Sequence, residues 1–206
     1  MTKTITAFAA AAVLLATPAF GGDTLEPAHG TVEGYEPAVT GVLKAAFGPE
    51  VVVRAIVEPS FEPEYAVGIE KHGDEYRIFG LTASEQVWTA LNDQKPVAGI
   101  NANDCRLPIT ADLATDILGV WKGMLLRVHT QVDSEGVDGA IYFFSMMIDG
   151  QPHIGQTWSP LPSSPPGKLV SLANAMRDVC RWNRPHALDR VTAITADLKA
   201  SLQDNP

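Results

Sequence analysis

The chain has few basic residues and a clear excess of acidic ones. Its 206 residues include 15 lysines and arginines against 24 aspartates and glutamates, a formal net charge of −9. Nucleic acid is a poor partner for such a chain, because affinity for the phosphate backbone comes from cationic side chains. An anionic membrane surface is a poor partner for the same reason.

The sequence also lacks the short motifs of common enzymes. It contains no GxSxG nucleophile elbow, no HExxH, no Walker A loop, no GxGxxG and no EF-hand loop. Its five histidines are scattered, and none pairs with another at metal-ligand spacing on one element. We therefore predict no metal and no cofactor. An enzyme whose catalytic residues are dispersed along the chain is still compatible with these absences.

Only one long apolar run is present, at the N-terminus. Lys3 precedes the small and apolar run from Ile5 to Ala16, and a small-residue segment follows it. This order is typical of a secretory signal peptide. The run is shorter than the roughly 20 residues that cross a bilayer. We predict a signal peptide over residues 1–21 and a periplasmic or secreted mature chain without a membrane span. A buried N-terminal helix is the alternative.

The two cysteines, Cys105 and Cys180, both belong to the expected mature chain. In an oxidising compartment we expect one disulfide between them. Closing so long a loop would contribute about 4 kcal/mol on the chain-entropy model. Two separate buried thiols are the alternative. The chain has no CxxC pair and no Cys/His cluster that would indicate a redox or zinc site.

Periodicity predicts one globular α+β domain over residues 35–206, preceded by a flexible lead-in over residues 22–34. Helical spacing occurs around 35–47, 82–91, 110–128, 169–184 and 188–202, and strand-like runs occur at 51–57, 65–71, 75–81, 140–148 and 153–158. Residues 82–85 fit a capping box for the second helix. Because tight turns join the strand pairs, we predict a largely antiparallel sheet built from hairpins and packed against several amphipathic helices.

The hairpin of residues 140–158 is the segment of greatest functional interest. Asp149 and Gly150 predict a type I′ turn, in which both central residues have positive φ. Alternation places Tyr142, Phe144, Met146 and Ile148 on one face and Ile141, Phe143, Ser145 and Met147 on the other. Both faces are therefore apolar, and only one needs to cover the core. The other is either covered by helices or exposed beside Trp158, where it would form a binding surface.

The leading interpretation is an exported, non-catalytic binding protein of the inhibitor or immunity type. Its partner would be a periplasmic protein or a cell-wall fragment. The expected contact residues are Tyr142, Trp158 and Arg181, because aromatic anchors and guanidinium donors dominate binding interfaces.

The alternative interpretation is a periplasmic hydrolase with a dispersed site. Arg127 would stabilise developing charge, His129 would act as the base, and Asp138 would orient it. His129 also has a structural explanation, because a cation near a helix C-terminus complements the helix dipole.

Overall fold

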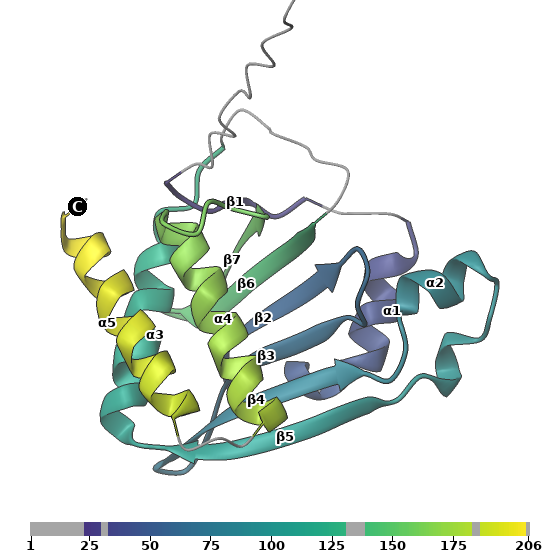
Figure 1. Ribbon diagram of the computed structural model, residues 1–206, viewed down its shortest axis with the longest axis horizontal. Helices are drawn as coiled ribbons and strands as arrows, with labels where there is room; N and C mark the ends of the chain where they lie inside the picture. Colours follow the sequence, from purple (N-terminus) through teal and green to yellow (C-terminus); the bar gives the residue numbers. More distant parts are fainter. Residues whose placement is uncertain (1–22, 30–32, 131–138, 183–185, 205–206) are drawn as a thin grey trace, which may run out of the picture.

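The computed structural model describes residues 23–29, 33–130, 139–182 and 186–204. They form an α+β fold, as the sequence predicts, with one seven-stranded antiparallel sheet in the order β1-β7-β6-β2-β3-β4-β5 (Figure 1). One half contains β2 (Val51–Pro59), β3 (Tyr65–His72), β4 (Glu75–Ala83) and β5 (Ala102–Ile109), and the other contains β1 (Glu26–Pro27), β6 (Ala140–Ile148) and β7 (Gln151–Trp158).

Tight turns set the register of the sheet. At the β6–β7 turn, Asp149 has φ 51° and Gly150 has φ 77°. Both values are positive, which confirms the expected type I′ geometry. Phe144 consequently pairs with Gly155, and Tyr142 pairs with Thr157.

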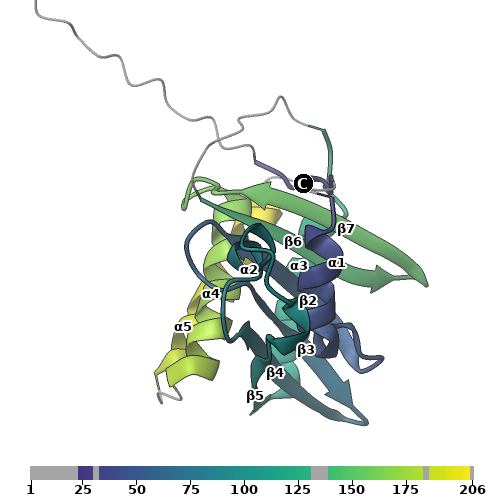
Figure 2. The ribbon, with the colours of Figure 1, turned by 90° about the vertical axis from the view of Figure 1, so that its right-hand side faces the viewer.

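Helices lie on both faces of the sheet. α3 (Ala111–Leu125), α4 (Pro165–Trp182) and α5 (Ala187–Asp204) lie on one face (Figure 1). α1 (Tyr35–Val42), α2 (Val87–Asn92) and the 3₁₀ turns η1 (Lys44–Phe47) and η2 (Val97–Gly99) lie on the other. Figure 2 shows the sheet between α4 and α5 on one side and α1 on the opposite side.

The larger core lies between the sheet and the three long helices. Trp121 of α3 meets Phe144 of β6 edge to face, with ring centroids 5.4 Å apart. Leu169 and Met176 of α4 are fully buried against the same strands. The apolar stripes of these helices therefore pack against the hairpin face that contains Tyr142.

The smaller core, around Leu43 and Phe79, covers the other face of the sheet only in part. Its buried side chains come from the segment containing α1 and η1, from β3 and β4, and from the segment containing α2 and η2. Over β6 and β7 this face is left partly open: Met147 is 58 % exposed and Ile154 is 48 % exposed. The sequence left open whether helices cover this face or whether it is exposed. At Met147 and Ile154 it is exposed.

The Cys105–Cys180 disulfide is present, as predicted, with its two Cα atoms 5.6 Å apart. Cys105 lies on the edge strand β5, which leads into α3, so the bridge joins the sheet edge to α4. Strand β5 itself was not predicted.

The segment before α1 and the start of α2 also differ from expectation. Leu25 is buried, and Glu26 and Pro27 pair with β7, so part of the expected lead-in is fixed to the sheet.

Helix α2 begins at Val87, and no capping-box contact is seen at its N-cap, Gln86. The carboxylate of Glu64 instead accepts hydrogen bonds from the first amides of this helix.

Candidate binding sites

The three expected contact residues lie on two different faces of the sheet. Tyr142 lies on the helix-covered face of β6, and Arg181 lies in the last turn of α4. Trp158 pairs with Ile141, which places its side chain on the opposite face. Tyr142 and Arg181 line one common hollow, and Trp158 is not part of its lining.

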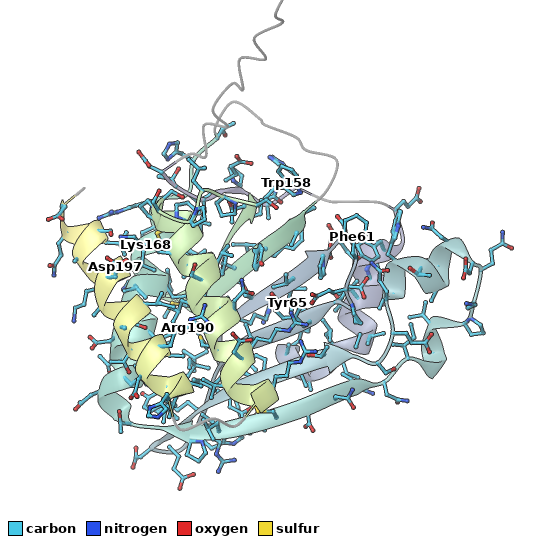
Figure 3. All side chains as sticks on the ribbon, viewed as in Figure 1. Phe61, Tyr65, Trp158, Lys168, Arg190 and Asp197 are labelled. Atoms are coloured by element: carbon cyan, nitrogen blue, oxygen red, sulfur yellow. A yellow bond between two sulfur atoms is a disulfide. The ribbon has the colours of Figure 1, made fainter. Side chains whose placement is uncertain are left out.

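This hollow, here called the α4 hollow, lies between α4 and the ends of β2, β3 and β6. Its volume is about 490 Å³, and its lining includes Phe61, Tyr65, Tyr142, Asn174, Arg177 and Arg181. Phe61 lies on the loop between β2 and β3 and is 79 % exposed. Figure 3 shows Phe61 near the ends of the strands and Tyr65 further in, close to α4.

Hydrogen bonds fix the floor of the α4 hollow. The Tyr65 hydroxyl donates to Asn174 Oδ1 at 2.7 Å, and Asn174 Nδ2 donates to the Tyr142 hydroxyl at 3.3 Å. Burial raises the pKa of Tyr65, and the neighbouring Tyr142 adds to this effect. The Tyr65 phenol is therefore neutral at ordinary pH and acts as a hydrogen-bonding group.

Arg177 is held in place at the wall of the hollow. Its guanidinium lies 3.9 Å from the centroid of the Tyr65 ring. Two of its nitrogens each lie 3.1 Å from the same Glu62 carboxylate oxygen, Oε2. Stacking and ion pairing together reduce the side-chain entropy that a partner would otherwise have to fix.

A second cavity adjoins the first and shares Glu62, Arg177 and Arg181 with it. It measures about 550 Å³ and is lined by both cysteines of the disulfide, by Asn103 and Asp104 of β5, and by Arg177 and Arg181. The two arginines therefore line both cavities.

The residues of the hydrolase interpretation make structural contacts. Arg127 Nη2 donates to the carbonyl of Leu202 near the end of α5, at 2.8 Å. The His129 ring lies 3.2 Å from the Arg127 carbonyl and 3.3 Å from Thr24 Oγ1. Asp138 lies outside the described residues. These contacts join the C-terminal end of α3 to α5 and to the segment before β1.

A third site lies on the partly open face of the sheet, the hairpin face that the sequence predicts as a binding surface if it is exposed. This sheet groove has a volume of about 300 Å³. It is lined by α1, by η1, by the residues after β1, and by one face of β2, β6 and β7. Its apolar lining includes Val39, Phe47, Ile56, Phe143 and Ile154.

A buried acid forms part of the lining of the sheet groove. Glu58 of β2 is 7 % exposed, and its Oε2 has no hydrogen-bond partner among the described residues. Burial raises the pKa of Glu58 to about 8, and the negative charges of Glu36 and Glu64 contribute. Perturbed acids of this kind concentrate at functional sites.

A cationic side chain, Arg54, lies at the opposite end of the sheet groove. Arg54 lies four positions before Glu58 on β2. Because side chains alternate between the two faces of a strand, both lie on the groove face. The Arg54 guanidinium lies 4.3 Å from the centroid of the Phe47 ring, and burial lowers its pKa. Within the described part of the chain, no group of three His, Cys, Asp or Glu side chains could hold a metal ion.

No family model matches this chain, and comparisons with curated proteins and with solved structures give no match either. No described helix is long and apolar enough to cross a membrane.

Proposed function

We propose that this is an exported, non-catalytic binding protein that captures a periplasmic partner through the α4 hollow. The partner is another protein, as for an inhibitor or immunity-type protein, or a cell-wall fragment. The observation that carries the proposal is Phe61, a large apolar side chain held out in solvent beside two arginines.

The composition of the hollow is that of a binding hot spot. Burying a phenylalanine side chain is worth about 1.5–3 kcal/mol, which the free protein does not obtain from Phe61. Arginine and tyrosine are the residue types that most often dominate such interfaces. Arg177 and Tyr65 are already fixed by their mutual stacking, so binding has little ordering cost at these positions.

Two further observations support export. A disulfide between distant segments persists mainly in oxidising compartments. The N-terminal pattern is typical of a secretory signal peptide. Together they favour the periplasm or the extracellular space.

The decisive experiment is quantitative capture from periplasmic extract with the mature chain as bait. Phe61→Ala and Arg181→Ala should each lose the same partner. Met147→Ala is the matched control, because it truncates an exposed apolar side chain on the opposite face of the sheet. A parallel titration with soluble cell-wall fragments tests the second class of partner.

The outcomes separate the interpretations. A protein or fragment that the unmodified chain and Met147→Ala retain, and that Phe61→Ala loses, supports the proposal. Retention unaffected by both hollow variants would overturn it. Cell-wall fragments of altered mass after incubation with the pure protein would instead show catalysis.

A further inference from the structure

Two features point to a second binding site: the buried Oε2 of Glu58, which has no hydrogen-bond partner among the described residues, and the apolar walls around it. We propose that the sheet groove binds a small organic amine. Its ammonium group would contact Glu58, and its apolar body would lie along the partly open face of β6 and β7. This site is separate from the α4 hollow and does not depend on the function proposed there.

The first argument is the unsatisfied acid. A buried polar atom without a hydrogen-bond partner costs free energy, and native structures rarely keep one without a reason. Glu64, which lies nearby, is fully satisfied by Tyr35 and by the amides of Val87 and Trp88. Glu58 Oε2 has no comparable donor among the described residues. An ammonium group would supply one.

The second argument is the sign of the local charge. The groups around Glu58 are Glu36 and Tyr35 of α1, Glu64 before β3, His29 after β1, and Arg54 on β2 itself. Arg54 is four residues from Glu58, about 13 Å along an extended strand, and its guanidinium stacks on Phe47. The Glu58 end of the groove therefore has an excess of carboxylates, which favours a cation.

The third argument is the shape and composition of the walls. Phe143 and Ile154 of the hairpin lie opposite Val39 of α1, with Ile56 of β2 in the same lining. The volume of about 300 Å³ is at the lower end of the range for small-molecule sites. An amine with a short apolar body matches both the acid and the walls.

The proposal predicts a specific link between binding and pH. The ammonium binds the ionised form of Glu58, and an alkylammonium itself keeps its proton up to about pH 10.4, like lysine. Binding at neutral pH should therefore release a proton from Glu58. With the Glu58 pKa at about 8, lowering the pH from 8.5 to 6.5 should weaken binding roughly 25-fold.

The test is a titration with n-hexylamine, followed by amide chemical shifts of the isotope-labelled protein. The neutral analogue 1-hexanol has the same apolar body and serves as the reference probe. We expect hexylamine to bind at least about tenfold more tightly than hexanol at pH 8.5, with shifts in α1, β6 and β7, and to lose that advantage at pH 6.5.

Variants separate the contributions of individual groups. Glu58→Gln keeps the shape of the side chain and should abolish both the preference for the amine and the pH dependence. Glu85→Gln removes an exposed acid outside the groove and should leave both unchanged. His29→Gln shows whether a further titratable side chain of the groove lining contributes.

The result that would overturn the proposal is equal affinity for hexylamine and hexanol at pH 8.5, or no shifts with either probe. If Glu58→Gln does not fold, calorimetry of the unmodified protein in buffers of different ionisation enthalpy still decides the question. Release of a proton on hexylamine binding at pH 7 supports the proposal, and binding without release contradicts it.

Discussion

The acid in the sheet groove should make the stability of the protein depend on pH in an unusual direction. Burial raises the pKa of Glu58 from its ordinary value of 4.5 to about 8. Between these two pH values the folded protein keeps a proton that the unfolded chain has released. Stability should therefore fall as pH rises through this window, whereas most carboxyl groups have the opposite effect.

The magnitude follows from the width of the window. Each pH unit corresponds to about 1.4 kcal/mol, so the window of 8 − 4.5 = 3.5 units gives at most about 5 kcal/mol. The contribution of neutral Glu58 is complete below pH 4.5 and is lost by about pH 8. At pH 7, which is 2.5 pH units above 4.5, about 3 kcal/mol of this stability has been lost.

The assay is urea unfolding of the unmodified protein and of Glu58→Gln at pH 5, 7 and 8.5. The variant stays neutral at every pH, so its stability relative to the unmodified protein should increase by about 3 kcal/mol or more from pH 5 to 8.5. Other acids titrate in the same range, but they are common to both proteins and cancel in the difference. Glu85→Gln, at an exposed position, is the control and should show a constant difference.

A constant difference between Glu58→Gln and the unmodified protein, within about 0.5 kcal/mol across this range, would refute the reasoning. It would mean that Glu58 ionises at its ordinary pKa in the folded protein. The groove would then have to admit enough water to solvate the carboxylate.

Two further predictions concern the framework that holds these sites. Replacing both Cys105 and Cys180 with alanine should lower the free energy of unfolding by about 4 kcal/mol, because the bridge spans 75 positions; an unchanged urea midpoint would contradict this. Glu64→Ala should cost about 3 kcal/mol in urea unfolding, since it leaves the Val87 and Trp88 amides and the Tyr35 hydroxyl without their acceptor, and a cost below 1 kcal/mol would show that water replaces it.

Features with a strong local signal were predicted from the sequence. The hairpin turn at Asp149 and Gly150 depends on two adjacent residues that tolerate positive φ. Helix α3 has a regular apolar stripe and an N-cap, Thr110, whose hydroxyl accepts from the Leu113 amide. The disulfide followed from the number of cysteines and the expected compartment, without knowledge of the fold.

Features that depend on distant partners were missed. Strand β5 is an edge strand with exposed polar residues such as Asn103 and Asp104, so its sequence lacks the apolar alternation of a central strand. The cap of α2 comes from Glu64, which is not adjacent to the helix in sequence. A capping-box pattern identifies only partners that are close in sequence. Here the buried carboxylate of Glu64 accepts the hydrogen bonds that a local cap would otherwise accept.

The candidate sites, too, were predicted only in part. Tyr142 and Arg181 were chosen by residue type, and the structure places both in one hollow. Phe61 was missed because a single aromatic residue between prolines carries no periodic signal. Glu58 directly follows a β-branched run, where an acid ordinarily marks the end of a strand. Its burial in the groove between α1 and β2 is evident only from the three-dimensional structure.

The pairing of β1 with β7 has a consequence for the order of folding. The first described strand lies beside one of the last, and the hydrogen bond from the His29 amide to the Gln156 side chain joins positions 127 residues apart. Contacts of such high sequence separation form late, because a long loop must close first. Until then the outer edge of β7 has unpaired amides and carbonyls, which are prone to intermolecular association. In a chain that emerges N-terminus first, β1 would wait without its strand partner until β7 had also emerged.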